Sequence, residues 1–239
     1  MGELTAYEVS EGVAVVRLDR PDTRHAINTP MLEELLGHLA AAREDDEVRA
    51  LVVSSTDHLG LSAGADVREQ LDEEGRVRRM QLFADLYDEL TAFPKPTVAA
   101  CHGATVGGGA EIAVACDIRV GGSNLRLRFP GASLGVPVGP ARLVTLAGLS
   151  VAKYMLLVGK EIAADEALRW GLVHKVAPAA RTEQVAIELA TACAAHPPEA
   201  VARLKRMLHE WDGVVERSRA EGEGQVEWQR SGPGLPSAD

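Results

Sequence analysis

The chain has 239 residues, of which 46% are hydrophobic, and its formal net charge at pH 7 is -10. This apolar content is enough for a buried core, and the negative charge argues against a nucleic-acid partner, because phosphate binding rewards a clustered basic face. No segment approaches about eighteen uninterrupted apolar residues, and the N-terminus has no basic start, so we expect neither membrane insertion nor export. The three cysteines are widely spaced without a CxxC pair, which fits a reducing, cytoplasmic location.

The first half of the chain alternates strands and helices. The spacing of apolar residues predicts, in chain order, a strand over 13–18, a helix over 29–43, a strand over 50–53, a helix over 76–92, a strand over 97–101 and a helix that opens at the triple glycine 107–109. This alternation predicts an α/β fold.

The last third is predicted to be helical. Helices are expected over 141–147, 151–158, 163–170 and 183–195, followed by a long one from 198 to about 216. Pro197-Pro198 marks the expected internal boundary. We therefore divide the chain into a core over 1–195 and a C-terminal helical region over 196–239 that ends in a frayed tail.

Two glycine-bearing segments carry most of the functional information: Ser62-Ala63-Gly64-Ala65-Asp66 and the segment from Gly103 to Glu111. Each leaves backbone N-H groups free at a turn. A carbonyl oxygen that becomes an enolate needs two such donors aimed from different directions. Glu111 follows the second donor, and a carboxylate beside a polarised carbonyl can move protons at the adjacent carbons. The pattern indicates a site for enolate chemistry.

Other interpretations of these residues exist. A glycine-rich turn can serve tight helix packing alone, and a glutamate in a first helical turn is favoured by the helix dipole. The glycines match neither GxGxxG nor GxxxxGK[ST], which argues against nucleotide binding.

The segment 60–64 matches the GxSxG nucleophile elbow of serine hydrolases. Asp117 or Asp165 and then His174 follow Ser62 in the right chain order. The elbow must join a strand directly to a helix, yet residues 55–60 separate the preceding strand from it. We interpret this match as accidental.

The segments 61–66 and 102–117 resemble the signature of the enoyl-CoA hydratase/isomerase, or crotonase, superfamily. Segment 20–28 resembles its N-terminal acyl-CoA loop, and 164–176 resembles its late helix-to-strand segment, so the resemblance runs from about residue 5 to 210. It implies a crotonase-like spiral of ββα units with a C-terminal helical region that builds trimers or paired trimers. The implied ligand is an acyl-CoA thioester, with coenzyme A as part of the substrate. No metal is expected, because no His, Cys and carboxylate cluster has ligand spacing, and no redox cofactor is expected either.

The resemblance also assigns roles to individual residues. It places the two oxyanion-hole amides on Ala65 and Gly108, and the general acid/base on Glu111. It places the following residues around the adenine and pantetheine of the coenzyme: Ala26, Ala63, Asp66 and Val67. Arg24 and Arg68 fall where basic residues of the family can meet the coenzyme's phosphates, with a solvated surface role as the alternative.

Two histidines depart from the family pattern. His25 and His102 stand where the family usually has Asn, and we expect both to be hydrogen-bonded structural residues. The family also continues into an acidic helix that contains Glu-Gly, which we do not expect within this chain.

The second glutamate of the family's hydratases is absent, because its position falls on Gly131. Paired acids with separated pKa values let one site both take and give a proton, so efficient hydration is in doubt. Loop acids could substitute, although solvated roles are the default for them: Glu69, Asp72, Glu73 and Glu74. We expect a hydratase/isomerase-like lyase or isomerase. The alternatives are a double-bond isomerase, thioester hydrolase or decarboxylase of the same fold, or a catalytically silent acyl-CoA-binding subunit.

Overall fold

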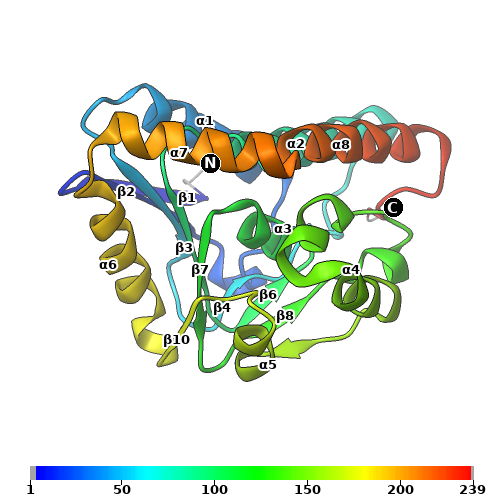
Figure 1. The fold of residues 1–239 in the computed structure, drawn as a ribbon. Coiled ribbons are helices and arrows are strands. Elements are labelled where there is room, and N and C mark those ends of the chain that lie inside the picture. The colour runs from blue at the N-terminus through cyan, green and yellow to red at the C-terminus, as the bar shows by residue number, and fades with distance from the viewer. Residues whose placement is uncertain (1–3, 238–239) are drawn as a thin grey trace.

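The strands form two sheets in the computed structural model, which describes residues 4–237 (Figure 1). The larger sheet has the order β1-β2-β3-β5-β7-β10 and consists of β1 (Thr5–Ser10), β2 (Val13–Leu18), β3 (Ala50–Ser55), β5 (Thr97–Cys101), β7 (Ile118–Gly122) and β10 (Lys175–Ala177). The smaller sheet has the order β4-β6-β8-β9 and consists of β4 (Gly60–Ser62), β6 (Ala104–Val106), β8 (Arg126–Arg128) and β9 (Ile162–Ala163). Neighbouring strands are parallel except in the pairs β1/β2 and β8/β9.

Successive strands alternate between the two sheets, as in β3 to β4, β5 to β6 and β7 to β8. Each of these pairs leads into a helix: α2 (Glu73–Thr91), α3 (Gly108–Ala115) and α4 (Pro140–Val158), respectively. The remaining helices are α1 (Thr29–Glu44), α5 (Ala164–Arg169), α6 (Thr182–Ala194), α7 (Pro198–Asp212) and α8 (Val214–Ser231). This repetition is the predicted spiral of ββα units.

The larger sheet is buried on both faces, which explains its nearly continuous apolar strands. Successive side chains of a strand point to opposite faces. One face carries Val13, Val15, Ala50, Val52, Val98 and Ala100, which pack with Ala186 and Ala190 of α6. The alternate residues of the same strands, such as Val16, Leu51 and Val53, join the main core with Leu32 and Leu35 of α1. Apolar spacing predicts β2, β3 and β5, whereas the strands of the smaller sheet are too short for spacing to reveal.

The C-terminal region differs from the prediction. The single helix expected over 198–216 is wrong, because Gly213 adopts a left-handed φ of 70° and separates α7 from α8. α8 lies along α2, where an added Cβ on Gly222 would come within 3.0 Å of the Ala84 Cβ, so this glycine permits close helix packing. α8 contains Glu221-Gly222, so a helix with a Glu-Gly pair lies within the described residues, contrary to the expectation.

The described part of the tail is not frayed, which corrects a second expectation. Leu235 is buried, and its amide donates to Gln229 Oε1 at 2.8 Å. The carbonyl of Pro236 accepts a hydrogen bond from Arg79 Nη2 at 3.1 Å. Residues 238 and 239 lie outside the described part. The boundary at 195/196 stays a prediction.

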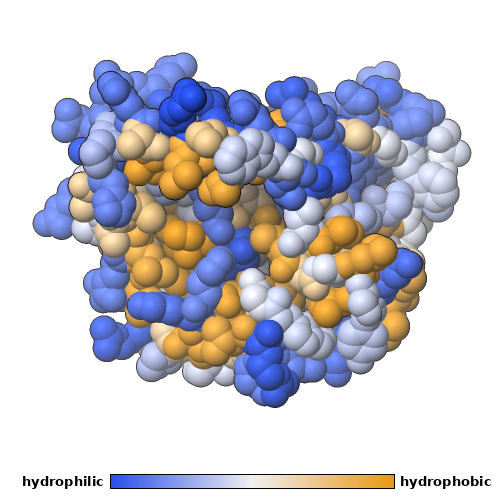
Figure 2. Space-filling view, in the orientation of Figure 1, coloured by the Kyte–Doolittle hydropathy of each residue, from blue (hydrophilic) through white to orange (hydrophobic). Residues whose placement is uncertain are grey.

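Exposed apolar side chains gather over α4 and α7 on the face in Figure 2. They include Leu149, Leu157 and Val158 on α4, and Leu204, Leu208 and Trp211 on α7. Among the described helices, α4 is the one that is long and apolar enough to cross a bilayer by length and composition alone. Its two halves, predicted as separate helices, meet at Gly148, which has a non-helical φ of 76° and ψ of 155°.

Candidate active site

Three loops form the site, and each follows the carboxyl end of a strand of the smaller sheet. Ala63 to Ala65 follow β4, Gly107 and Gly108 follow β6, and Phe129 to Gly131 follow β8. Strands β4, β6 and β8 are neighbours and parallel, so their carboxyl ends lie at the same edge of the sheet. The topology therefore brings the two glycine-bearing segments together, as a binding site in an α/β sheet requires.

The glycines are needed because the two backbones touch. Gly64 has a φ of +97°, and an added Cβ there would lie 2.9 Å from the carbonyl oxygen of Val106. An added Cβ on Gly109 would lie 2.7 Å from the Ser62 Cβ. Contacts this short are not tolerated, so only glycine allows the loops to approach.

The amides of Ala65 and Gly108 have no hydrogen-bond acceptor within residues 4–237. Their neighbours are occupied: the amide of Asp66 donates to Ile27 O at 2.8 Å, and that of Gly107 donates to Arg128 O at 2.9 Å. Gly108 is the first residue of α3, where an N-H has no partner within the helix and faces the positive end of its dipole. Both loops are thus anchored while one amide in each stays available.

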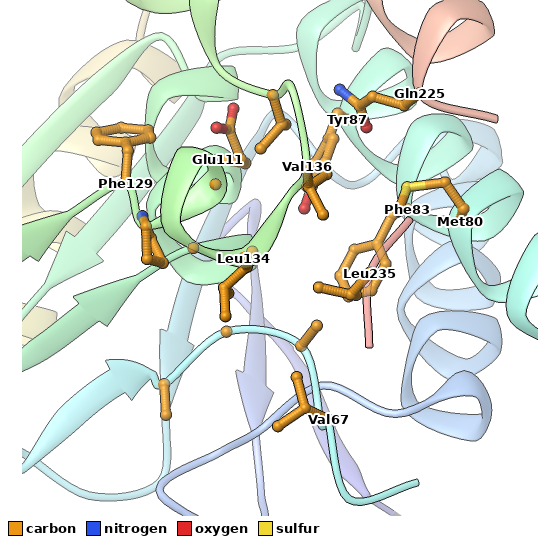
Figure 3. A pocket seen from close by; sticks show the side chains of 18 residues that line it. Val67, Met80, Phe83, Tyr87, Glu111, Phe129, Leu134, Val136, Gln225 and Leu235 are labelled. Carbon is orange, nitrogen blue, oxygen red and sulfur yellow. The ribbon is translucent and has the colours of Figure 1, made fainter. Parts of the chain in front are cut away.

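Residues of both glycine-bearing segments, together with Glu111, line a cavity of about 200 Å³ (Figure 3). Its wall is mainly apolar and includes Val67, Met80, Phe83, Phe129, Leu134, Val136 and Leu235. Glu111 is the one carboxylate among the described residues that line it. An apolar cavity with a few polar groups is the usual form of a small-molecule site.

The Glu111 carboxylate is held by a buried network that the sequence analysis missed. Its Oε2 accepts from Arg142 Nη2 at 2.9 Å and from Arg142 Nε at 3.3 Å. Arg142 also donates to Glu221 Oε1 at 2.6 Å and to Ser218 Oγ at 2.7 Å. The other oxygen of Glu111, Oε1, is buried without a partner in the described structure. One oxygen is therefore fixed, and the second is free for a ligand.

The pKa of Glu111 is raised from 4.5 to about 7. Burial is the main cause, because it disfavours the charged carboxylate; Arg142 lowers the pKa and Glu221 raises it again. The pKa of Arg142 is above its ordinary value: burial lowers it, but the charges of Glu111 and Glu221 outweigh that effect. Glu111 can therefore both accept and release a proton near neutral pH.

Gly131, where the resemblance predicts that a second glutamate is missing, lines the same cavity. An added Cβ there would lie 2.5 Å from the carbonyl oxygen of Val136 and 3.0 Å from Val138 Cγ1. The following segment thus fills the space that a side chain at this position requires.

The residues assigned to the coenzyme lie together around a second hollow of about 330 Å³. Its lining includes all six of them, namely Arg24, Ala26, Ala63, Asp66, Val67 and Arg68. It shares Ala63, Ala65 and Val67 with the first cavity, so the two hollows are adjacent.

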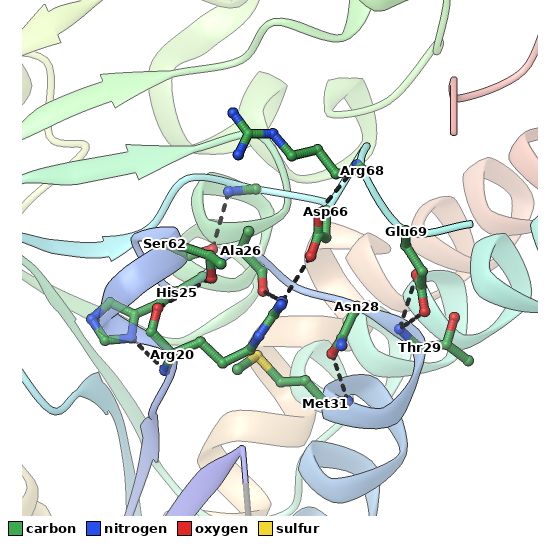
Figure 4. Close-up of polar contacts among 12 residues, drawn as sticks. Arg20, His25, Ala26, Asn28, Thr29, Met31, Ser62, Asp66, Arg68 and Glu69 are labelled. Atoms are coloured by element: carbon green, nitrogen blue, oxygen red, sulfur yellow. Dashed lines mark hydrogen bonds and ion pairs between the residues drawn. The ribbon is translucent and has the colours of Figure 1, made fainter. Parts of the chain in front are cut away.

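Polar contacts hold the loops around this hollow (Figure 4). Arg20 Nη1 donates to Asp66 Oδ2 at 3.0 Å and to Ala26 O at 2.5 Å. The amide of Arg68 donates to Asp66 Oδ1 at 3.1 Å. Asp66 therefore orders the loop.

The hydrolase interpretation has no geometric support. Ser62 is fully buried; its hydroxyl donates to His25 O at 2.7 Å and accepts from the amide of Gly64 at 3.0 Å. His174, its supposed base, accepts a hydrogen bond at Nδ1 from the amide of Arg119 instead. Ser62 serves as a bridge between loops.

Both unusual histidines are hydrogen-bonded within the fold. His25 Nδ1 accepts from the amide of Arg20 at 3.1 Å, and His102 Nε2 lies 2.8 Å from Ser55 Oγ. Burial lowers the pKa of His102. Neither histidine lines the cavity that contains Glu111.

None of the four loop acids lines that cavity either. Glu69 accepts from the amide of Thr29 at 2.9 Å, and Asp72 caps α2 by accepting from the amide of Gly75 at 2.8 Å. This cap starts the helix three residues before the predicted position, so Glu73 and Glu74 lie in its first turn rather than in a loop.

A family model described as enoyl-CoA hydratase/isomerase matches residues 8–225. The chain is 34% identical over 206 residues to the 2,3-dehydroadipyl-CoA hydratase of Escherichia coli, covering 85% of this chain and 80% of that protein. It is 35% identical over 203 residues to the short-chain-enoyl-CoA hydratase of Clostridium acetobutylicum, covering 82% and 77%. Among solved structures, an enoyl-CoA hydratase/isomerase from Xanthobacter autotrophicus superimposes with a TM-score of 0.87 at 27% identity, covering 99% of this chain and 90% of that one.

Proposed function

The chain belongs to the enoyl-CoA hydratase/isomerase family, and on this premise we propose that it binds an acyl-CoA thioester whose carbonyl oxygen accepts from the amides of Ala65 and Gly108. The observation that carries the proposal is that Ala65 and Gly108, whose amides have no acceptor within residues 4–237, come from two anchored loops and line one cavity with Glu111. Donors already in place stabilise an enolate oxygen without reorganisation, and the loss of one costs roughly 3 to 4 kcal/mol.

Glu111 is the general acid/base in this proposal. Its free oxygen Oε1 and its raised pKa of about 7 support proton transfer at the carbons next to the thioester. The acyl group occupies the apolar cavity, and the coenzyme lies along the adjacent hollow that includes Arg24 and Arg68. The positive charges of these two arginines would attract the phosphates of the coenzyme, although the protein has a net charge of -10.

Two reactions fit these groups. In hydration, Glu111 takes a proton from the water that attacks C3 and then returns that proton to C2 of the enolate. In double-bond isomerisation, Glu111 takes a proton from one carbon and returns it to another, so one carboxylate suffices. Isomerisation is therefore the second candidate function. It is supported by Gly131, which supplies no second carboxylate, and by the closed space beside this residue.

A panel of 2-enoyl-, 3-enoyl- and 3-hydroxyacyl-CoA thioesters tests the proposal, with products separated by chromatography and weighed by mass spectrometry. A gain of one water identifies hydration, and a product of unchanged mass identifies isomerisation. We expect Glu111→Gln to lower the rate by about 10² to 10⁴-fold, while the exposed control Glu161→Gln retains it. Unchanged turnover in Glu111→Gln contradicts the mechanism. Binding without turnover by the wild type identifies the silent subunit.

We also propose that copies of the chain associate as trimers or hexamers in a reducing cytoplasm. The exposed apolar side chains of α7, which include Leu204, Leu208 and Trp211, support association. Sedimentation equilibrium of the purified protein tests it, and a monomer at micromolar concentration contradicts it.

A further inference from the structure

Tyr87 of α2 is a buried residue with an unused hydroxyl. The side chain is 4% exposed, and its hydroxyl has no hydrogen-bond partner in the described part of the chain. Its ring lies 5.1 Å from the Arg142 guanidinium carbon and 5.8 Å from the ring of Phe83, measured to the ring centroids. These contacts fix the ring, and Figure 3 shows its oxygen end directed into the cavity that contains Glu111.

The hydroxyl lies near Gly108. An added Cβ on Gly108 would be 3.3 Å from Tyr87 Oη and 3.0 Å from Phe83 Cε1. Tyr87 and Gly108 line the same cavity, so an oxygen bound by the Gly108 amide would lie close to the phenol. The absence of a side chain at residue 108 leaves this approach open.

The phenol keeps its proton and can therefore donate a hydrogen bond. Burial and then the charge of Glu111 raise the pKa of Tyr87 well above its ordinary value of 10.0. The group thus stays protonated at neutral pH and cannot serve as a base. A ligand oxygen in the cavity would supply the acceptor that this hydroxyl lacks among the described residues.

We propose that Tyr87 is a further catalytic residue, whose hydroxyl donates a third hydrogen bond to the thioester oxygen as the enolate forms. This inference rests on the proposed function. A third donor stabilises the charged intermediate, and this is useful in a site with one carboxylate.

Tyr87→Phe tests the proposal, because it keeps the ring contacts and removes only the oxygen. The two probes are acetoacetyl-CoA, whose acidic carbon yields an enolate with its own near-ultraviolet absorption, and butyryl-CoA, which stays neutral. We expect the variant to bind acetoacetyl-CoA at least about tenfold more weakly with a reduced enolate band, and butyryl-CoA within about twofold of the wild type. Where turnover is measurable, kcat falls by about a hundredfold. The melting temperature is expected to stay unchanged, since the hydroxyl has no partner to lose.

The control variant is Tyr154→Phe on the exposed side of α4, which is expected to change neither affinity. Equal affinities of Tyr87→Phe and wild type for acetoacetyl-CoA, or an equal loss for both thioesters, overturn the role of Tyr87 and leave the proposed function intact. Failure of the wild type to bind either thioester overturns both proposals, so the two failures are distinguishable.

Discussion

Arg142 Nη2 lies 2.9 Å from Glu111 Oε2, and their side chains are 2% and 1% exposed. The same guanidinium contacts Glu221 of α8 at 2.6 Å. One cation thus serves the buried carboxylate of Glu111 and the partly buried one of Glu221, and it ties the C-terminal helix directly to the candidate acid/base. This arrangement sets both the position of Glu111 and the charge around it.

Arg142→Met is expected to destabilise the protein strongly. Removal of one partner of a buried ion pair leaves uncompensated charges and costs about 3 to 5 kcal/mol of unfolding free energy. Without the cation, the pKa of Glu111 rises further. Urea unfolding measures the first effect, and the pH dependence of activity measures the second.

The control for this variant is Arg126→Met. Arg126 forms an exposed pair with Glu161 at 2.9 Å, and such surface pairs contribute little. We expect the unfolding free energy to change by less than about 0.5 kcal/mol. Similar losses for the two arginines would show that the buried network has no special role.

The pH dependence of kcat/KM is expected to report Glu111. The pKa of its carboxyl is raised to about 7 in the free protein, and only the deprotonated form acts as a base. For proton abstraction, kcat/KM therefore rises about tenfold per pH unit below pH 7 and levels above it. A profile that is flat between pH 5 and 8 contradicts the assignment.

Stability is expected to depend on pH in the opposite sense. The Glu111 pKa in the folded state, about 7, exceeds the ordinary value of 4.5, so the folded state binds more protons between these values. The stabilisation that comes from protonated Glu111 is fully present below about pH 4.5 and is lost as the pH rises through about 7. The free energy of unfolding changes by at most about 1.4 kcal/mol per pH unit in this range. Urea titrations at several pH values measure how much more the unfolding free energy of the wild type depends on pH than that of Glu111→Gln. This difference between the two proteins should shrink if another group is responsible.

Gly131→Ala tests the closed space at the position where a second glutamate is predicted to be missing. The new Cβ meets the Val136 carbonyl at 2.5 Å, so backbone must move, and we expect a loss of about 1 to 3 kcal/mol. For the same reason Gly131→Glu is not expected to create hydratase activity. Gly37→Ala in α1 is the control: its Cβ meets nothing within 4 Å, and it should stabilise the helix by about 0.5 to 1 kcal/mol.

Ser62→Ala separates a loop bridge from a nucleophile. The change removes a partner from His25 O and from the Gly64 amide, so we expect a loss of about 1 to 3 kcal/mol while turnover persists. Intact-mass measurement after mixing with substrate should detect no acyl-enzyme in the wild type. Abolished turnover together with an acyl adduct on the wild type would restore the hydrolase interpretation.

The α/β class, strands β2, β3 and β5 and most helices could be predicted from the sequence, because strand and helix spacing of apolar residues is a local property. β1 and β7 were not predicted. The sequence also identified the two glycine turns and Glu111. It missed the division between α7 and α8 at Gly213, where a glycine in a polar helical stretch gives only a weak stop signal. A lone arginine in the apolar segment 141–147 was an available signal of a buried partner.

The surroundings of Glu111 depend on the tertiary structure. Arg142, Glu221 and Tyr87 come from α4, α8 and α2, and no local pattern relates positions so far apart in the chain. The meeting of the Ala65 and Gly108 loops likewise depends on the parallel order of β4, β6 and β8, whose strands are too short to recognise. Backbone turns are specified by neighbouring residues, whereas the burial and charge that set a pKa depend on every element packed around the group.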